Sequence, residues 1–376
     1  MDAPEIYRLL VEGWPAEAEA QARALLDRNG SRLDVWGLLG KALRAQGRYH
    51  ETLEIQEALV EVRPGDFSAR FDLSETLLLL GDFDRGWREY RHRYSLPHTR
   101  PIERPVRRPR WNGEPLNGKT LLVHDEQGYG DVFQFLRLIP LVKARTGARI
   151  ILDIHPDLES FGRRLEGIDM VVPRGQPVPD FDVFCELMSL PMAMGLRRED
   201  LPGPIPYLSA LPDRVQRWRT VLGGLPRPLV GLVWAGSPTH GNDANRSLAL
   251  AQLAPLGAAE GTFLALQKGP AAAQAAAPPA GLTVRSLDRD IADFDDTAAI
   301  LEVIDLMISV DSSPAHLAGA LGRPVWTLLP FSPDWRWLLD REDSPWYPSM
   351  RLFRQPARGD WTTPIDRVAD ALRTLA

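Results

Sequence analysis

The fold is decided by the stretch Ile308-Ser309-Val310-Asp311-Ser312-Ser313-Pro314-Ala315-His316-Leu317-Ala318-Gly319-Ala320-Leu321-Gly322-Arg323-Pro324. It reads as a buried strand, polar residues at the strand's carboxyl end, and a helix packed through small residues. In an open parallel sheet, ligands bind where strand ends meet helix N-termini, because unpaired backbone N–H groups and the positive end of the helix dipole lie there. The pattern predicts a ligand site to which Asp311, Ser312, Ser313 and His316 contribute side-chain donors and acceptors.

Composition narrows the class of protein. A chain of 376 residues is long enough for two or three domains with real cores. The formal net charge of -6 argues against general binding to nucleic acid or to a membrane surface. The single cysteine, Cys185, excludes an internal disulfide and is expected to be buried. The N-terminus has no signal-peptide pattern and no apolar run is long enough to cross a bilayer, so we expect a cytoplasmic protein.

The N-terminal third repeats. Gly13, Gly47 and Gly81 are separated by 34 residues each, and this period is typical of tetratricopeptide repeats. We expect about three such repeats in residues 1–96, with each glycine at a turn between two helices. The repeats either form a concave surface for a protein or peptide or serve as a cap or a homo-oligomerisation element. Residues 97–116, rich in proline and arginine, are expected to form an extended linker, whose arginines either bind anions or are simply solvated.

Residues 117–226 have the pattern of a first α/β half. A buried strand at 120–124 is followed by a glycine turn and by helical apolar spacing over 132–145, which Pro140 is expected to kink or end. Further strands at 149–154, 170–172 and 181–187 alternate with helical segments, so a parallel sheet is predicted. Asp131 is either a first-turn cap of the helix or a general base at a cleft. Three neighbouring residues are expected to line that cleft: Gln127, Gly128 and Gly130.

Residues 227–376 repeat the pattern in a second α/β half. Arg246 and Lys268 each follow a predicted strand, and two cations at neighbouring strand ends suit a diphosphate, although each is also compatible with a surface ion pair. The cleft on this side is expected to be lined by Trp234, Gly236 and Asn245. Residues 293–296 (Asp-Phe-Asp-Asp) are interpreted as helix capping and not as a metal site, and no metal is expected elsewhere. The last helix, over 365–375, is expected to pack back across the junction of the two halves.

These residues resemble a known family. The stretch from Asp311 to Pro324 is similar to the signature of the heptosyltransferase family (glycosyltransferase family 9), and the Gly128–Asp131 turn resembles that family's N-terminal Gly-Asp turn. Residues 117–356 look like the glycosyltransferase half of bacterial tetratricopeptide proteins, distantly akin to protein O-GlcNAc transferases. The resemblance implies a GT-B fold, in which two Rossmann-like domains face a cleft. It also implies a metal-independent glycosyltransferase that needs no cofactor besides its nucleotide-diphosphate sugar donor.

The resemblance also implies roles by position. Asp131 becomes the general base, Arg246 and Lys268 become diphosphate ligands, and Asp311 contacts the sugar. Ser312, Ser313 and His316 are then expected to contact phosphate or sugar. Because repeats accompany the domain, the sequence favours a protein Ser/Thr acceptor docked by the repeats. The alternatives are a non-catalytic repeat adaptor that senses a nucleotide, and a glycosyltransferase acting on lipopolysaccharide or polysaccharide.

Overall fold

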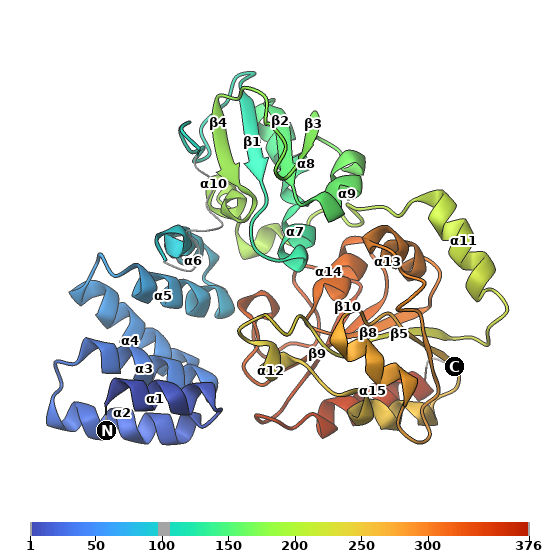
Figure 1. Ribbon diagram of the computed structural model, residues 1–376. Coiled ribbons are helices and arrows are strands. Elements are labelled where there is room, and N and C mark those ends of the chain that lie inside the picture. Colours follow the sequence, from blue (N-terminus) through green and yellow to red (C-terminus); the bar gives the residue numbers. More distant parts are fainter. Residues whose placement is uncertain (1, 97–105, 375–376) are drawn as a thin grey trace. The chain divides into compact units, whose positions relative to one another are not determined.

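The computed structural model describes residues 2–96 and 106–374, and this part of the chain divides into two compact units (Figure 1). The helical unit contains the N-terminal helices together with two short later segments, residues 195–199 and 331–340. The α/β unit contains residues 106–194, 200–330 and the chain from 341 onward. The division made from the sequence did not assign the two short segments to the helical unit. The predicted linker spans residues 97–116, and its part from 97 to 105 lies outside the described residues.

The helical unit consists of three successive helix pairs. Each pair turns at a glycine with positive φ, +87° at Gly13, +77° at Gly47 and +86° at Gly81, so the 34-residue period marks turns that only glycine adopts at low cost. This confirms a helical N-terminal region with a turn at each of these positions. The helices are α1 (Ala3–Val11), α2 (Pro15–Arg28), α3 (Leu33–Ala45), α4 (Tyr49–Val62), α5 (Phe67–Leu79) and α6 (Phe83–Tyr90), followed by a 3-10 turn, η1 (Arg91–Ser95).

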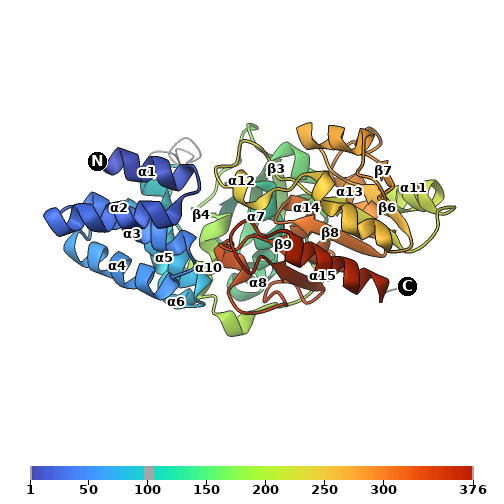
Figure 2. The ribbon, with the colours of Figure 1, turned by 90° about the horizontal axis from the view of Figure 1, so that it is seen from below.

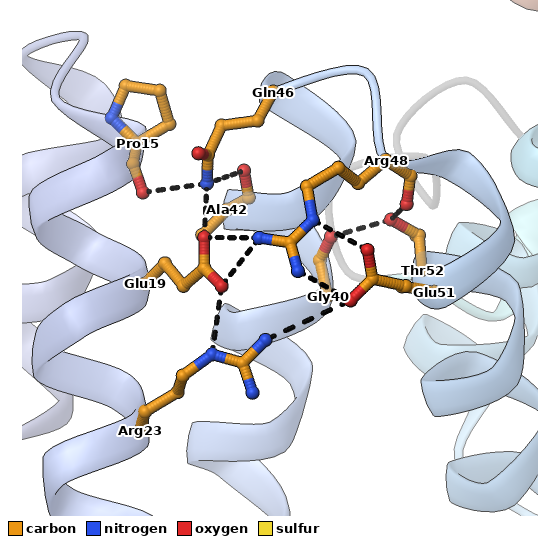
Figure 3. A network of polar contacts seen from close by, with 9 residues as sticks. All are labelled: Pro15, Glu19, Arg23, Gly40, Ala42, Gln46, Arg48, Glu51 and Thr52. Atoms are coloured by element: carbon orange, nitrogen blue, oxygen red, sulfur yellow. Dashed lines mark hydrogen bonds and ion pairs between the residues drawn. The ribbon is translucent and has the colours of Figure 1, made fainter.

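A partly buried carboxylate joins the first helix pair to the second (Figure 3). Glu19 of α2 accepts hydrogen bonds from Arg48 Nη1 at 2.7 Å and from Gln46 Nε2 at 2.8 Å. Arg23, one turn further along α2, donates to the same carboxylate at 2.8 Å. Burial raises the pKa of Glu19, but these hydrogen bonds outweigh burial and hold the pKa below its usual value. The pairing of charges fixes how the two helix pairs stack.

Residues 331–340 are part of the core of the helical unit. Trp335, in the 3-10 turn η7 (Trp335–Trp337), lies edge-on to Trp87 with ring centroids 5.3 Å apart. Phe331 packs on the turn at Gly47, where an added Cβ would lie 2.9 Å from the phenyl ring. The turn glycine therefore serves both backbone conformation and packing.

The first sheet of the α/β unit has four parallel strands in the order β3-β2-β1-β4. The predicted helix over 132–145 is two helices that break at Leu136 and Arg137, while Pro140 lies in the first turn of the second helix, where no intrahelical N–H is needed. The strands are β1 (Thr120–His124), β2 (Arg149–Ile154), β3 (Met170–Pro173) and β4 (Val183–Glu186). The helices of this half are α7 (Tyr129–Phe135), α8 (Leu138–Thr146), α9 (Glu159–Arg164) and α10 (Leu190–Met194), with 3-10 turns η2 (Pro156–Leu158), η3 (Leu187–Ser189) and η4 (Arg198–Asp200).

The second sheet has six parallel strands in the order β10-β9-β8-β5-β6-β7, and all residues of β5 and β8 at its centre are buried. Such continuous burial is typical of a parallel sheet covered on both faces. The strands are β5 (Leu229–Val233), β6 (Thr262–Ala265), β7 (Val284–Ser286), β8 (Leu306–Val310), β9 (Val325–Leu329) and β10 (Met350–Arg354). The helices are α11 (Pro212–Leu222), α12 (Asp243–Arg246), α13 (Phe294–Leu301), α14 (Ser313–Ala320) and α15 (Thr362–Arg373), with 3-10 helices η5 (Leu250–Ala258) and η6 (Pro270–Ala276).

The last helix packs within its own half. Ile365, Val368 and Leu372 of α15 share one apolar core with residues of η5 and of the six-stranded sheet, and α15 lies beside β9 and β10 (Figure 2). The apolar face of α15 is thus covered within the second half, and the expectation that this helix also packs back across the junction of the two halves stays a prediction. None of the described helices is both long and apolar enough to span a membrane.

Candidate active site

The stretch from Asp311 to His316 forms the junction between β8 and α14. Ser312 is the extended residue before the helix, and Asp311, Ser312 and His316 are 9%, 8% and 5% exposed. Ser309 Oγ lies 2.7 Å from the carbonyl oxygen of Val310 and 2.9 Å from Ser312 Oγ. Because the one hydroxyl proton of Ser309 goes to the carbonyl, Ser312 is the donor in the second bond and keeps acceptor capacity toward a ligand.

The ring of His316 is held at both nitrogens. Its Nδ1 lies 3.0 Å from the hydroxyl of Tyr347, and its Nε2 lies 3.5 Å from Asp311 Oδ1. Tyr347 is fully buried, so its hydroxyl provides a fixed anchor for the imidazole. The start of α14 therefore presents an oriented imidazole beside a buried carboxylate.

The glycine turn of the first half meets α14. Asp131 Oδ2 accepts the backbone N–H of Gly128 at 2.9 Å, which confirms that Asp131 caps α7. Its role as a general base stays a prediction. A Cβ added at Gly130 would lie 2.9 Å from His316 Cδ2 and 3.5 Å from Ser313 Cα. The structure thus brings the Gly128–Asp131 turn and the start of α14 together, and only glycine at position 130 allows this approach.

Tyr129 lies within this turn and is held by residues of both halves. Its hydroxyl donates to Asp157 Oδ2 at 2.6 Å, and its ring packs edge-on against His155 and Phe294. Burial, followed by the hydrogen bond to Asp157, raises the pKa of Tyr129 to about 12. The phenol is therefore a hydrogen-bond donor at neutral pH and not a base.

Arg246 reaches the same junction from α12. Its Nη1 donates to the backbone carbonyl of Asp311 at 3.0 Å, and its Nε lies 3.5 Å from Asp243 Oδ1. The side chain is 15% exposed, and Nε has no hydrogen-bond partner among the described residues. A Cβ added at Gly236 would lie 2.6 Å from Arg246 Nη2. A half-buried guanidinium with donors to spare, at the end of β8, suits an anionic ligand.

Gln267 positions the loop that precedes Arg246, and the sequence interpretation missed it. Its Oε1 accepts the backbone N–H groups of Trp234 and Ala235 at 3.0 and 2.9 Å, and its Nε2 donates to the carbonyls of Ala235 and Lys268 at 3.0 and 2.9 Å. The side chain is 3% exposed. The available signal was a polar residue two positions after the buried strand β6, where an unpaired amide is costly.

Two predicted site residues lie elsewhere. Trp234 is 0% exposed and belongs to the apolar core of the second half, so its side chain does not line a cleft. The Lys268 ammonium binds the 288–291 segment, with the carbonyl of Ile291 at 3.1 Å and Asp288 Oδ1 at 3.1 Å, instead of joining Arg246. Its diphosphate role stays a prediction that this geometry does not favour. Gln127 is exposed with φ +52°, and Asn245 is partly exposed on α12 beside Arg246.

The Asp293–Asp296 segment is a helix cap, as expected from the sequence. Asp293 Oδ1 accepts the backbone N–H of Asp296 at 2.9 Å, at the start of α13. Asp296 in turn binds Arg214 at 2.7 Å and Trp218 Nε1 at 3.0 Å. Burial raises the pKa of Asp296, but hydrogen bonds from the Ala292 backbone, Arg214 and Trp218 outweigh burial and hold this pKa below its usual value. Among the described residues, no group of three or more His, Cys, Asp or Glu side chains has an arrangement that holds a metal ion.

Arg137, at the break between α7 and α8, is a second residue that the sequence interpretation missed. It is 5% exposed and donates to the carbonyls of Trp346 at 2.8 Å and Pro202 at 3.1 Å. The guanidinium carbon also lies 4.9 Å from the ring centroid of Tyr347, the residue that holds His316. Within the described residues Arg137 has no carboxylate partner, so backbone carbonyls, the Tyr207 hydroxyl at 3.2 Å and aromatic rings solvate a buried cation. The signal was an arginine inside an otherwise apolar helical pattern.

Comparison with known proteins places this site in a family context. Residues 292–354, which include β8, α14 and β9, match the model of glycosyltransferase family 9 (heptosyltransferase). Protein FlbA of Caulobacter vibrioides is 29% identical over 330 residues, which are 82% of this chain but only 55% of that protein. The chain thus spans about half the length of this relative.

Two solved structures share the architecture. The family 9 glycosyltransferase of Veillonella parvula superposes with a TM-score of 0.50 at 12% identity, covering 70% of this chain and 100% of that one. The ADP-heptose lipopolysaccharide heptosyltransferase II of E. coli gives a TM-score of 0.50 at 16% identity, covering 68% and 98%. Residues 292–354 carry the sequence pattern of family 9 and the surrounding α/β unit has the heptosyltransferase fold, so this part of the chain is a glycosyltransferase domain.

Proposed function

We propose that the chain transfers a sugar from a nucleotide-diphosphate sugar to a hydroxyl group of a glycan acceptor of the lipopolysaccharide or polysaccharide kind. The observation that carries the proposal is the hydrogen bond from Arg246 to the Asp311 carbonyl, which holds a cation at the start of α14 inside the stretch that matches family 9. The E. coli neighbour that shares the fold is a lipopolysaccharide heptosyltransferase, which supports a glycan acceptor over the protein Ser/Thr expected from the sequence.

In this proposal the second half holds the donor. The diphosphate lies against the Arg246 guanidinium and the N-terminal end of α14, whose positive dipole end favours an anion. Asp311 and His316 face the donor sugar from the same junction. The guanidinium and the helix end stabilise the charge that grows on the leaving diphosphate.

Asp131 is the proposed base on the first half. The acceptor hydroxyl gives its proton to the Asp131 carboxylate while its oxygen bonds to the anomeric carbon of the donor. The bond between that carbon and the diphosphate oxygen breaks, and the nucleotide diphosphate leaves with the electron pair. Asp131 lies one residue from Gly130, which packs on His316, so base and donor site share one wall.

A second candidate, transfer to a protein docked by the helical unit, is favoured by one observation. The three helix pairs with turns at Gly13, Gly47 and Gly81 are the arrangement expected of tetratricopeptide repeats, and we propose that they are such repeats. Repeats of this kind present surfaces to other proteins. Under this alternative, deleting residues 1–95 abolishes transfer, whereas under the main proposal transfer to a free glycan acceptor persists.

The test measures nucleotide binding and transfer separately. Isothermal titration with UDP, GDP, CMP and ADP identifies the nucleotide, and Arg246→Ala is expected to weaken its binding by about 10- to 100-fold through loss of charged hydrogen bonds. Arg285→Ala on the exposed edge strand β7 is the matched control. Asp131→Asn is expected to keep nucleotide affinity and lose transfer, with the exposed Asp213→Asn as control. Unchanged transfer in Asp131→Asn contradicts the base assignment, and unchanged binding in Arg246→Ala contradicts the donor site.

A further inference from the structure

A buried arginine of the first half reaches the residue that orients His316. Arg137, at the break between α7 and α8, is 5% exposed, and its guanidinium carbon lies 4.9 Å from the ring centroid of Tyr347. The hydroxyl of Tyr347 lies 3.0 Å from Nδ1 of His316. Two consecutive contacts therefore connect a cation of the first half to the junction between β8 and α14.

Tyr347 depends on side-chain contacts for its position. It lies three residues before β10, outside the hydrogen-bonded ladder of the sheet. The backbone of α14 approaches its ring closely, since a Cβ added at Gly319 would lie 2.4 Å from Tyr347 Cγ. Arg137 Nη1 donates to the carbonyl of Trp346, the residue before Tyr347, at 2.8 Å. Arg137 thus holds this segment twice, through the backbone of Trp346 and through the ring of Tyr347.

Arg137 is itself held rigidly. Its Nη1 also donates to the Pro202 carbonyl at 3.1 Å, and its Nη2 donates to the Tyr207 hydroxyl at 3.2 Å. That hydroxyl donates in turn to the Phe133 carbonyl of α7 at 2.8 Å. A guanidinium is a planar fork, so bonds from both of its terminal nitrogens fix the plane of the group as well as its position. The surface that Arg137 presents to Tyr347 is therefore fixed.

The imidazole of His316 needs such an anchor. The last torsion of a histidine side chain has a broad, roughly two-fold energy profile, so the torsion alone permits more than one ring orientation. A half-turn of the ring would exchange its nitrogens for carbons. It would remove the contact of Nδ1 with Tyr347 and the approach of Nε2 to Asp311 Oδ1 at 3.5 Å. A displaced Tyr347 would therefore release the ring from the orientation that faces Asp311.

We propose that Arg137 is a positioning residue: by holding Tyr347 it fixes the imidazole of His316 in the orientation that recognises the donor sugar. The inference rests on the proposed function, in which Asp311 and His316 face the sugar and Arg246 binds the diphosphate. Arg246 reaches the junction from α12, where the Asp311 carbonyl holds it. Loss of Arg137 should therefore weaken recognition of the sugar and leave recognition of the diphosphate intact.

The first experiment separates the sugar from the diphosphate. The full chain is titrated calorimetrically with three pairs of compounds: UDP and UDP-glucose, GDP and GDP-mannose, and ADP and ADP-heptose. Arg137→Met and Tyr347→Phe are each expected to lower the affinity for the nucleotide sugar that binds by about tenfold, the effect of one lost hydrogen bond in a site. The affinity for the corresponding nucleotide diphosphate is expected to change by less than about twofold.

The matched control is Arg164→Met. Arg164 is another partly buried arginine of the first half, and it binds the Ser209 carbonyl at 3.1 Å and Asp295 at 2.6 Å instead of Tyr347. Its replacement removes a guanidinium of the same kind from the same half without touching the support of His316. Both affinities are expected to stay at their wild-type values.

The second experiment reads the His316 ring directly and needs no nucleotide. NMR of protein with isotopically labelled histidines follows the Nδ1 resonance of His316, which His316→Gln assigns. We expect Arg137→Met to shift this resonance in the same direction as Tyr347→Phe, and Arg164→Met to leave it unchanged. The double variant Arg137→Met/Tyr347→Phe is expected to lose no more sugar affinity than Tyr347→Phe alone, because Arg137 acts through that hydroxyl.

Several results would overturn the proposal. Wild-type affinity for the nucleotide sugar in Arg137→Met, or equal losses for the sugar and the diphosphate, would leave Arg137 a merely structural role. An unmoved His316 resonance in the same variant would show that Arg137 does not hold the ring. Additive losses in the double variant would show that Arg137 acts by another route.

Two further outcomes keep the test decisive. If the wild-type chain binds none of the six compounds, the proposed function fails, and the His316 resonance alone decides the positioning role. If circular dichroism shows that Arg137→Met does not fold, Arg137→Gln takes its place, because it keeps an N–H donor for the Trp346 carbonyl while it removes the cation.

Discussion

Replacing Gln267 with leucine is expected to loosen the donor side of the site and destabilise the α/β unit. The side chain, 3% exposed, makes four hydrogen bonds to the backbone of Trp234, Ala235 and Lys268. Leucine has similar volume but no polar atoms, so these backbone groups lose their partner. The segment it holds leads directly to Gly236, whose close approach leaves room for the Arg246 guanidinium.

The expected loss follows from the groups left unpaired. Two backbone N–H groups lose their acceptor, and at about 1–3 kcal/mol each their cost is about 4 kcal/mol. The apolar surface that leucine adds returns about 1 kcal/mol. We therefore expect the free energy of unfolding to fall by about 3 kcal/mol. The carbonyls of Ala235 and Lys268 lie nearer to solvent and add little, because water reaches them.

Urea unfolding followed by tryptophan fluorescence measures this loss, and nucleotide titration measures its effect on the site. Gln274→Leu is the matched control, because this exposed glutamine makes one hydrogen bond, to the Leu250 N–H at 2.7 Å, and is expected to cost about 1 kcal/mol or less. Gln267→Glu keeps the acceptor but turns a carboxylate toward two carbonyls, so it is expected to rescue little. Equal losses in the Gln267 and Gln274 variants, or wild-type nucleotide affinity in Gln267→Leu, would refute the reasoning.

Three further changes test the rest of the α/β unit. Gly130→Ala places a Cβ 2.9 Å from His316 Cδ2, so we expect thermal unfolding to show a stability loss of about 1–3 kcal/mol and calorimetry to show weaker nucleotide binding. Unchanged nucleotide affinity would argue against a donor site that is bounded by the Gly128–Asp131 turn. Arg137→Met leaves the buried carbonyl of Trp346 without its donor and is expected to lower the free energy of unfolding by about 2 kcal/mol. Arg137→Lys is not expected to restore this stability, because an ammonium group cannot stack on aromatic rings and donate to two carbonyls at once as a guanidinium does. Asp296→Asn is expected to lower stability at pH 7. The folded pKa of Asp296 is held below its unfolded value, so the stabilisation by its carboxylate is present above about pH 4 and is lost as the pH falls through the folded pKa. The urea unfolding curves of the wild-type chain and of Asp296→Asn should therefore converge in acid and differ at neutral pH.

Local patterns in the sequence were sufficient to find the central strands. The bounds of β1 and β2 coincide with the predicted segments, because these strands are short apolar runs between turn residues. Strands β7 (Val284–Ser286) and β10 (Met350–Arg354) were not predicted, since both lie at sheet edges and carry exposed arginines. The break at Arg137 could not be found from Pro140, because a proline in the first turn of a helix costs nothing.

The site residues, like the strands, were predicted where local sequence decides their position and missed where distant contacts do. Asp311, Ser312 and His316 were predicted because they follow a strand directly, and strand ends in a parallel sheet meet at one edge. Lys268 follows a strand too, but its long side chain reaches the 288–291 segment, and that contact depends on a tertiary arrangement. Trp234 continues an apolar run in which every side chain is buried, so its direction could not be read from alternation.

The site depends on glycines that each leave room for one specific side chain. Gly236 accommodates the Arg246 guanidinium, Gly130 accommodates the His316 ring, and a Cβ at Gly319 would lie 2.4 Å from Tyr347 Cγ. Tyr347 holds His316, so all three close approaches act on the junction between β8 and α14. A glycine makes no directional contact of its own, and its effect is to let rigid backbone approach a side chain that then has one position. The geometry of this junction is therefore set by backbone packing across the α/β unit, which is why single side-chain motifs identified its location but not the residues that hold it in place.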